Sequence, residues 1–349
     1  MAHVDEQTAL IRALFAAAAG GATECEAADG GDSAVAGAPW QDMLQRLRQV
    51  TRADGAALWL DPARGRGPSW VHGTMAGPEA AIRRSLRFDR VYGADELPGD
   101  PGDAGALRVV KARAGTHLQA TLGIARQSHR QDFRSADGQQ LNALAPFLGQ
   151  AAEIWARHQA ARERAARDAG LAAGLGAGWL LLDATGLILD LSPAARTWGA
   201  ALGLQLAARR RLDLADGARA LALRGGLTAC LAGEGPVPLT LSRDPLVELV
   251  LTRDPGPGDA AILARLRHSM PCAAIPPARI ARHFALTLSE ARLTALICDG
   301  HSLRDAAHRL GWTEATARTC SKAIFARLGV SGQPGLVRRV LSGALWLEA

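Results

Sequence analysis

The sequence predicts an α+β fold in which mixed domains built on antiparallel sheets are followed by an all-α, four-helix domain. Three observations support this prediction. The chain has 349 residues, which is too long for one ordinary domain and long enough for two or three. Between residues 56 and 266, short apolar runs of strand length alternate with turns rich in Gly and Pro. From Ile280 onward, apolar residues recur at the three- and four-residue spacing that is typical of helices.

The N-terminal third is predicted to contain a helix, a loop and a first sheet. Residues 1–38 are interpreted as a short amphipathic helix and a mobile loop, because the loop is rich in Gly, Ala, Asp and Ser. Residues 39–165 contain a helix, several strands and a long closing helix for which Ser135 is the expected N-cap. This pattern resembles a GAF-like domain. The closing helix continues past Trp155 with scarcely an apolar stripe, so we expect it to bridge two domains or to pair with a partner chain.

A second sheet is predicted for residues 166–266. Two apolar runs flank Asp183-Ala-Thr-Gly186, which indicates a hairpin, and Ser192-Pro193 then starts a helix with Pro at its first position. Further strands are expected up to Leu266, and the pattern resembles a PAS-like domain. Residues 267–279 contain three prolines and are interpreted as a linker.

The excess positive charge lies at the C-terminal end. Residues 279–349 hold ten Arg or Lys and five Asp or Glu, whereas residues 1–278 hold thirty and twenty-nine. A basic module attached to a nearly neutral body suits phosphate binding, because neutralising phosphates releases counterions. A merely solvated basic surface is the alternative that charge alone leaves open.

The cysteines and the N-terminus indicate the compartment. The five cysteines are odd in number and form neither a C-x-x-C nor a Cys/His pattern, so we predict no metal site and a reduced, cytoplasmic location. The first residues are acidic where a signal peptide needs a basic segment. No stretch approaches the ~20 apolar residues of a transmembrane helix, so no membrane partner is expected.

Glycines and capping residues divide the C-terminal domain, residues 280–349, into four expected helices. Gly300, Gly311 and Gly329 stand where helices should end. Ser289 is the expected N-cap of the first helix, and Ser302 caps the second, with an acid three residues later. Thr313 caps the third helix, residues 313–328, after the tight turn at Gly311, and the fourth lies around residues 336–341.

The third helix has two distinct faces. Ala317, Ser321, Ile324 and Leu328 repeat at helical spacing and form the inward face. Three polar residues share another face near the start of the helix, and they suit the edges of bases in a major groove: Arg bridges guanine O6 and N7, Thr offers a methyl or hydroxyl group, and Lys reaches a base or a phosphate. These residues are Arg318, Thr319 and Lys322.

The spacing of these residues resembles the LuxR-type (GerE) helix-turn-helix signature. It is carried by Leu286-Thr287-x-x-Glu290, Gly300-x-Ser302, Ala307-x-x-Leu310-Gly311, Thr316-Ala-Arg318 and Ile324-x-x-x-Leu328-Gly329-Val330-Ser331. Within that family, the chain resembles a subgroup of stand-alone bacterial regulators. The resemblance implies a sequence-specific, DNA-binding transcription regulator that acts as a homodimer on double-stranded DNA.

The resemblance also implies roles for individual residues. Base contacts are expected from Arg318, Thr319 and Lys322. Phosphate contacts are predicted for Ser302, Thr313, Thr316 and Arg327. The dimer contact of the fourth helix is predicted at Leu336, Val337, Val340 and Leu341. Three positions depart from the family pattern, namely Trp312 in the turn, Ala306 in the second helix, and Cys320, for which an inert packed thiol is expected rather than a redox switch.

Two questions remain open at this stage. The N-terminal domains either sense an unidentified small-molecule ligand or serve only to dimerise, and Trp59, Trp70, His72 and His117 are candidates to line a pocket or simply to belong to core and surface. No catalytic motif, such as G-x-S-x-G, a P-loop or H-E-x-x-H, is present, so we predict no catalytic residues, no cofactor and no enzyme activity. The alternative is a signalling enzyme or ligand-binding protein with an attached DNA-binding head.

Overall fold

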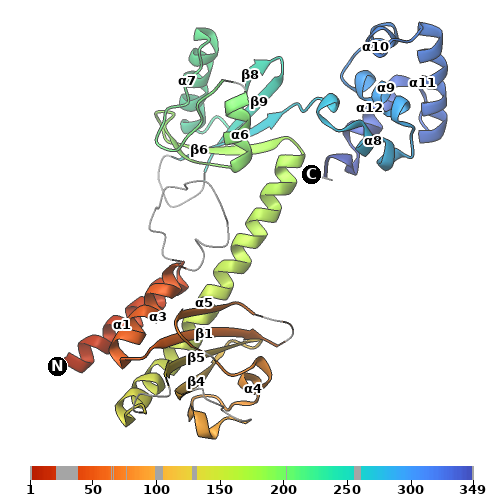
Figure 1. Cartoon of the computed structure of the whole chain (residues 1–349). Helices are drawn as coiled ribbons and strands as arrows, with labels where there is room; N and C mark the ends of the chain where they lie inside the picture. The colour runs from red at the N-terminus through yellow and green to blue at the C-terminus, as the bar shows by residue number, and fades with distance from the viewer. Residues whose placement is uncertain are drawn as a thin grey trace. The chain divides into compact units, whose positions relative to one another are not determined.

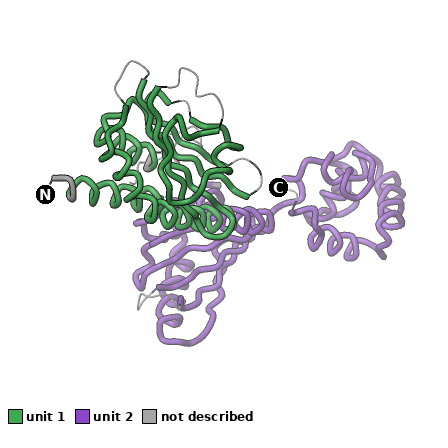
Figure 2. The backbone as a smooth tube through the Cα atoms, turned by 90° about the horizontal axis from the view of Figure 1, so that it is seen from below, with its two compact units in different colours: residues 1–164 green, residues 165–349 purple. Residues whose placement is uncertain are grey.

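A computed structural model describes the chain as two compact units. It covers residues 2–20, 38–63, 65, 67–75, 77–98, 105–127, 132–201, 203–254 and 261–347. Unit 1 comprises Met1–Arg164 and unit 2 comprises Ala165–Ala349, and Figure 2 colours them separately. None of the described helices is long and apolar enough to cross a membrane.

Unit 1 is a five-stranded antiparallel sheet with helices packed on one face. Its strand order is β2-β1-β5-β4-β3. The described elements are α1 (Ala2–Ala18), α3 (Ala38–Thr51), β1 (Gly55–Pro62), β2 (Ser69–Gly73), α4 (Ala80–Ser85), β3 (Val91–Gly93), the 3₁₀ turn η1 (Ala94–Glu96), β4 (Ala106–Ala114), β5 (Leu118–Arg126) and α5 (Ser135–Gly174).

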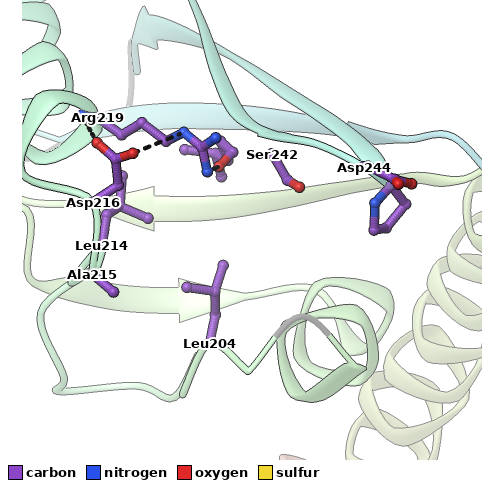
Figure 3. A pocket seen from close by; sticks show the side chains of 9 residues that line it. Leu204, Leu214, Ala215, Asp216, Arg219, Ser242 and Asp244 are labelled. Carbon is purple, nitrogen blue, oxygen red and sulfur yellow. Dashed lines mark hydrogen bonds and ion pairs between the residues drawn. The ribbon is translucent and has the colours of Figure 1, made fainter.

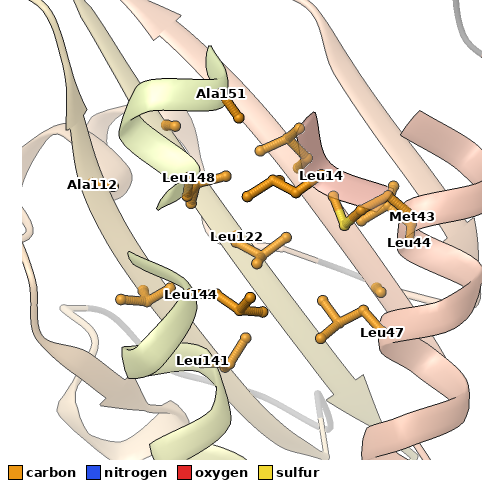
Figure 4. Close-up of a cluster of buried hydrophobic side chains, with 14 of the residues drawn as sticks. Leu14, Met43, Leu44, Leu47, Ala112, Leu122, Leu141, Leu144, Leu148 and Ala151 are labelled. Carbon is orange, nitrogen blue, oxygen red and sulfur yellow. The ribbon is translucent and has the colours of Figure 1, made fainter. Parts of the chain in front are cut away.

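The core of unit 1 lies between the sheet and three helices. Figure 4 shows Leu14 of α1, Leu44 of α3 and Leu148 of α5 converging on Leu122 of β5. The strands predicted from the apolar runs are present as β1, β4 and β5. Alternate residues of each strand face this core, as the pleat of a strand requires. The prediction set residues 1–38 apart from the first sheet domain. In the structure, the N-terminal helix α1 instead packs into the same core as the sheet. The predicted loop lies mostly outside the described residues.

Helix α5 is the longest element and crosses the division between the two units. Its first half is buried in the core of unit 1, whereas its residues 160–168 are all exposed. The helix begins at Ser135 itself, so Ser135 is not the N-cap that we predicted. The Asp137 carboxylate instead accepts a hydrogen bond from the backbone N–H of Arg134, at 2.9 Å.

Unit 2 begins with a second five-stranded antiparallel sheet. Its order is β7-β6-β10-β9-β8, and the predicted hairpin joins β6 to β7. The Asp183 carboxylate closes that turn by accepting hydrogen bonds from the N–H groups of Thr185 and Leu187. The elements are β6 (Ala177–Leu182), β7 (Ile188–Leu191), α6 (Pro193–Ala201), α7 (Gly217–Leu231), β8 (Val237–Arg243), β9 (Leu246–Arg253) and β10 (Ile262–His268).

The remainder of unit 2 is helical and has a hydrophobic core of its own. It contains five α-helices among the described residues, one more than predicted (Figure 1). The α-helices are α8 (Pro277–Phe284), α9 (Leu288–Cys298), α10 (Leu303–Leu310), α11 (Glu314–Leu328) and α12 (Gly332–Leu341). The 3₁₀ turns η2 (Cys272–Ala274) and η3 (Ala344–Leu347) precede and follow them.

The predicted linker, residues 267–279, is largely ordered structure. It holds the end of β10, η2 and the first turn of α8, and its Cys272 is buried in the core of the helical part. The Asp299 carboxylate at the end of α9 accepts hydrogen bonds from the backbone N–H groups of Cys272, at 2.6 Å, and Ala273, at 2.9 Å. Proline content alone predicted an open linker, but these bonds hold its second half to α9.

Candidate nucleic-acid interface

Helices α10 and α11 are joined by the tight turn that the glycine predicted. Gly311 has a left-handed φ of 70°. Glycine adopts this conformation with little steric strain, because it has no Cβ. Its N–H and that of Trp312 donate to the carbonyls of His308 and Ala307, the pattern of a Schellman motif. The turn therefore ends α10 sharply and lets the N-cap of α11, Thr313, follow two residues later.

Hydroxyl caps open both helices. Ser302 Oγ accepts from the N–H of Asp305 and donates to its carboxylate, at 2.6 Å. Thr313 Oγ1 accepts from the N–H of Thr316, and the two threonine hydroxyls lie 2.8 Å apart. Since only one hydrogen is shared between those two hydroxyls, one hydroxyl hydrogen stays available to an outside acceptor such as a phosphate oxygen.

The two faces of α11 are confirmed. Ala317, Ser321 and Ile324 are buried in the helical core, as their spacing predicted. The opposite side is exposed and carries the three predicted base-contacting residues together with the small residues Ala315, Ala323 and Ala326. Because small side chains keep this side of the helix narrow, long basic side chains project beyond it.

Arg318 has an ion-pair partner within its own helix. Its Nη2 lies 2.7 Å from Oε1 of Glu314, one turn earlier, and both side chains are exposed, at 62% and 49%. Lys322 lies one turn later on the same side of the helix and forms no ion pair with any of the described residues. The N-terminal half of α11 thus presents two cations and one anion to solvent.

Arg327 lies at the other end of α11 in a different environment. Its Nη1 is 2.5 Å from Oε2 of Glu290, and the exposed fraction of that carboxylate side chain is only 10%. At ~100° per residue, Arg327 lies about half a turn around the helix from Arg318. The phosphate contact predicted for Arg327 therefore competes with an internal ion pair and remains a prediction.

Glu290 also caps α9, which corrects the predicted cap. Its carboxylate accepts from the N–H of Thr287, and the Thr287 hydroxyl accepts from the N–H of Glu290, so Thr287 and not Ser289 is the N-cap. Burial alone would raise the pKa of Glu290. The hydrogen bonds from Thr287 and the guanidinium of Arg327 outweigh burial and hold this pKa below its ordinary value of 4.5.

The predicted dimer contact on α12 is only partly exposed. Leu336 and Val340 are fully buried in the core of the helical part, so they cannot face a partner chain. Val337 is half-buried, and Leu341 is 45% exposed. Two of the four predicted contact residues are therefore taken up by the core of their own domain, and a dimer contact at the other two, Val337 and Leu341, remains a prediction.

The positions that depart from the family pattern are accommodated by packing. Ala306 is fully buried, and Trp312 packs partly buried against the same core. Burial raises the pKa of the Cys320 thiol, which disfavours the reactive thiolate. This direction agrees with the expectation of an inert packed thiol.

The aromatic residues considered for a pocket in unit 1 serve packing. The ring of Trp70 contacts those of Trp40 and Trp155, with centroids 5.5 and 5.3 Å away. Trp59 is buried in β1 beneath the guanidinium of Arg83. Over the described ranges, no three His, Cys, Asp or Glu side chains gather into a group that could hold a metal ion.

A half-open pocket of about 390 Å³ lies beside the second sheet. Figure 3 shows Asp216 and Arg219 of the α7 end on one side and Asp244 of the β8–β9 turn on the other. Arg219 Nη1 donates to the carbonyl of Leu241 at 2.9 Å, and its Nε lies 3.8 Å from Asp216. With Ser242 between them, the pocket offers both cationic and anionic groups. Sequence analysis did not identify these residues.

No protein-family model matches the chain, and no curated protein matches it. Three solved structures that resemble parts of it are the phage VqmA–DPO complex, the Vibrio cholerae VqmA dimer in the absence of target DNA, and the E. coli DhaR(N)–DhaL complex. Sequence identities are 16%, 14% and 14%, and TM-scores are 0.23, 0.21 and 0.31. The matches cover 55%, 48% and 77% of this chain and 94%, 83% and 90% of the others. Such TM-scores do not establish a shared fold. The functional proposal therefore rests on the geometry of α10 and α11.

Proposed function

We propose that the chain is a sequence-specific, double-stranded DNA-binding transcription regulator of the LuxR type, with α11 as the recognition helix. The observation that carries the proposal is the exposed face of Arg318, Thr319 and Lys322 on the first half of a helix that follows a glycine turn. Buried residues fix the opposite face of that helix to the domain, so the basic face is held ready for a major groove.

The groups around this face suit the phosphate backbone. The Thr313–Thr316 hydroxyl pair and the N-terminal N–H groups of α10 and α11 lie at helix starts, where anions are favoured. Ser302 is proposed as a further phosphate contact, for which its hydroxyl hydrogen has to turn from the Asp305 carboxylate to the phosphate. These groups position the helix, whereas the basic face reads the sequence.

Selection from a library of duplexes with a randomised central region tests this proposal directly. The purified full-length protein should enrich a symmetric motif whose half-sites lie about 10 base pairs apart, because a homodimer places two recognition helices in successive major grooves. The double variant Arg318→Ala/Lys322→Ala should enrich no motif at the same protein concentration.

The matched control is Arg338→Ala/Arg339→Ala on α12, which removes the same charge from exposed positions of another helix. It should enrich the wild-type motif. A wild-type protein that enriches nothing would contradict the proposed function. Equal enrichment by the Arg318→Ala/Lys322→Ala variant would place the reading surface elsewhere.

Homodimerisation is part of the proposal, with Val337 and Leu341 as the exposed apolar residues of α12. Sedimentation of the protein with and without the selected duplex should show two chains per duplex. Leu341→Asp should weaken this assembly, because it places a charge in an apolar contact. A single chain per duplex would rule out the dimer.

A regulatory ligand is the second element of the proposal, supported by the pocket beside α7. Its mixture of guanidinium, carboxylates and leucines suits a small zwitterionic molecule. Amino acids and short amino alcohols should be screened by thermal unfolding, with Arg219→Ala as the control that loses any stabilisation. Sustained turnover of such a molecule by the protein would instead favour the alternative of a signalling enzyme with a DNA-binding head.

A further inference from the structure

Glu314 differs from the other acidic residues of the helical part. Within residues 271–347, Glu290 caps α9 and binds Arg327, Asp299 holds η2, and Asp305 pairs with the Ser302 hydroxyl. Among these acids, Glu314 alone is paired with nothing but an exposed arginine, Arg318. A carboxylate at this place needs an explanation, because it lies on the face proposed to meet a polyanion.

We propose that Glu314 is a specificity-determining positioning residue, which orients Arg318 toward a guanine edge and penalises binding to DNA that lacks it. The inference rests on the proposed function of α11. Its basis is the 2.7 Å contact between Arg318 Nη2 and Glu314 Oε1 on the exposed first turns of that helix.

The orienting effect follows from the donors of the guanidinium. Arg318 has five N–H donors in a planar fork, and one contact to Glu314 leaves an edge of two donors for guanine O6 and N7. A side chain already held in one arrangement loses less conformational freedom when it binds. Arg318 can therefore keep its contact to Glu314 while it reads a base.

The penalty arises on DNA without the matching guanine. There the strongest acceptors for Arg318 are phosphate oxygens, and turning toward them breaks the contact to Glu314. The carboxylate is then left unpaired in the negative field of the duplex, which is unfavourable. Non-specific binding thus costs an ion pair that specific binding retains.

Titration of two duplexes tests the inference, one carrying the motif selected by the wild-type protein and one with the same bases scrambled. Glu314→Gln should bind the scrambled duplex roughly two- to fivefold more tightly, a range set by the one exposed ion pair that the wild type breaks only on that duplex. Its affinity for the motif duplex should stay within about twofold, so the specificity ratio falls. Glu248→Gln removes the same charge from an exposed position on β9 and should leave the ratio unchanged.

A cycle with Arg318→Ala separates positioning from direct contact. In that background Glu314→Gln should leave the specificity ratio unchanged, because there is no guanidinium to orient. An equal shift on both duplexes in the single variant would overturn the inference and leave only a long-range charge effect. A ratio that still falls in the Arg318→Ala background would overturn the positioning role. If the wild type selects no motif, it is the proposed function that fails.

Discussion

The two ends of α11 each carry an Arg–Glu pair. The two pairs consist of the same residue types but differ in sequence separation, in the helices that they join and in burial. Glu314 and Arg318 are four residues apart, lie on one helix and are exposed. Glu290 and Arg327 are 37 residues apart, join two helices, and include a carboxylate that is 90% buried. In the protein without DNA, water solvates both charges of the exposed pair, so separating Arg318 from Glu314 costs little. Arg327 cannot leave Glu290 without stranding a buried charge.

This difference indicates which arginine is available to DNA. An exposed pair is worth little, so Arg318 can exchange or share its partner when a base edge approaches. The pair at the other end contributes to the packing of α11 on α9. The same residue type is thus proposed for recognition at one end of the helix and contributes to packing at the other.

The largest expected difference between the two ends is in DNA affinity. Arg318→Ala should weaken binding to the selected motif about ten- to hundredfold, because a bidentate guanine contact is lost. Arg327→Ala should weaken it by less than about threefold when both proteins are folded. Fluorescence anisotropy with a labelled duplex measures both. A comparable loss for Arg327→Ala would support the phosphate contact that the sequence resemblance implied.

A smaller effect is expected for the free energy of unfolding. Here the Glu290–Arg327 pair should matter more than the Glu314–Arg318 pair. Glu290→Ala should lower the free energy of unfolding of the helical part by about 1–3 kcal/mol, since it leaves Arg327 unpaired and removes the α9 capping box. Glu314→Ala should change it by less than about 0.5 kcal/mol. Hydrogen exchange of the α9 and α11 amides in urea measures the free energy of unfolding of each variant. Equal losses would mean that the buried pair has no special structural role.

The smallest effect concerns pH. The folded-state pKa of Glu290 lies below the value of 4.5, so the ionised carboxylate stabilises the fold above that pH, and the stabilisation is lost as the pH falls through the lower, folded-state value. The Asp305 carboxylate, with its pKa lowered by the Ser302 hydroxyl, acts in the same direction. Melting temperatures from pH 6 downward should therefore fall less steeply for Glu290→Gln than for the wild type. Parallel curves would contradict this assignment.

The parts of this arrangement that depend on local rules were predictable. The glycines that end α9, α10 and α11 all have positive φ, because each helix needs a left-handed residue there. The inward and outward faces of α11 followed from spacing alone. The cap of α9 was also predictable but was missed: Thr287-x-x-Glu290 has the spacing of a capping box, whereas Ser289 has Arg292 three residues later.

The parts that depend on distant neighbours were not predictable. The spacing of apolar residues predicted an apolar stripe on α12. It did not show that the stripe's own domain covers Leu336 and Val340, as the structure does. No helix was predicted for Gly217–Leu231, where α7 contains Gly225 and Gly226, residues of low helix propensity. A Cβ on Gly226 would come within 3.0 Å of the Leu239 side chain, so this glycine permits close packing on the sheet.

The hydrogen bonds at the supposed linker limit the freedom of the chain where it enters the helical part. The N–H of Ser269 donates to the carbonyl of Leu246 in the sheet, and that of Cys272 donates to Asp299 in the helices. Only Met270 and Pro271 lie between these anchors, so Ser269 and Cys272 can be at most about 11 Å apart at their Cα atoms. So short a tether has almost no slack, so it limits how far the helical part can separate from the end of β10 at this point.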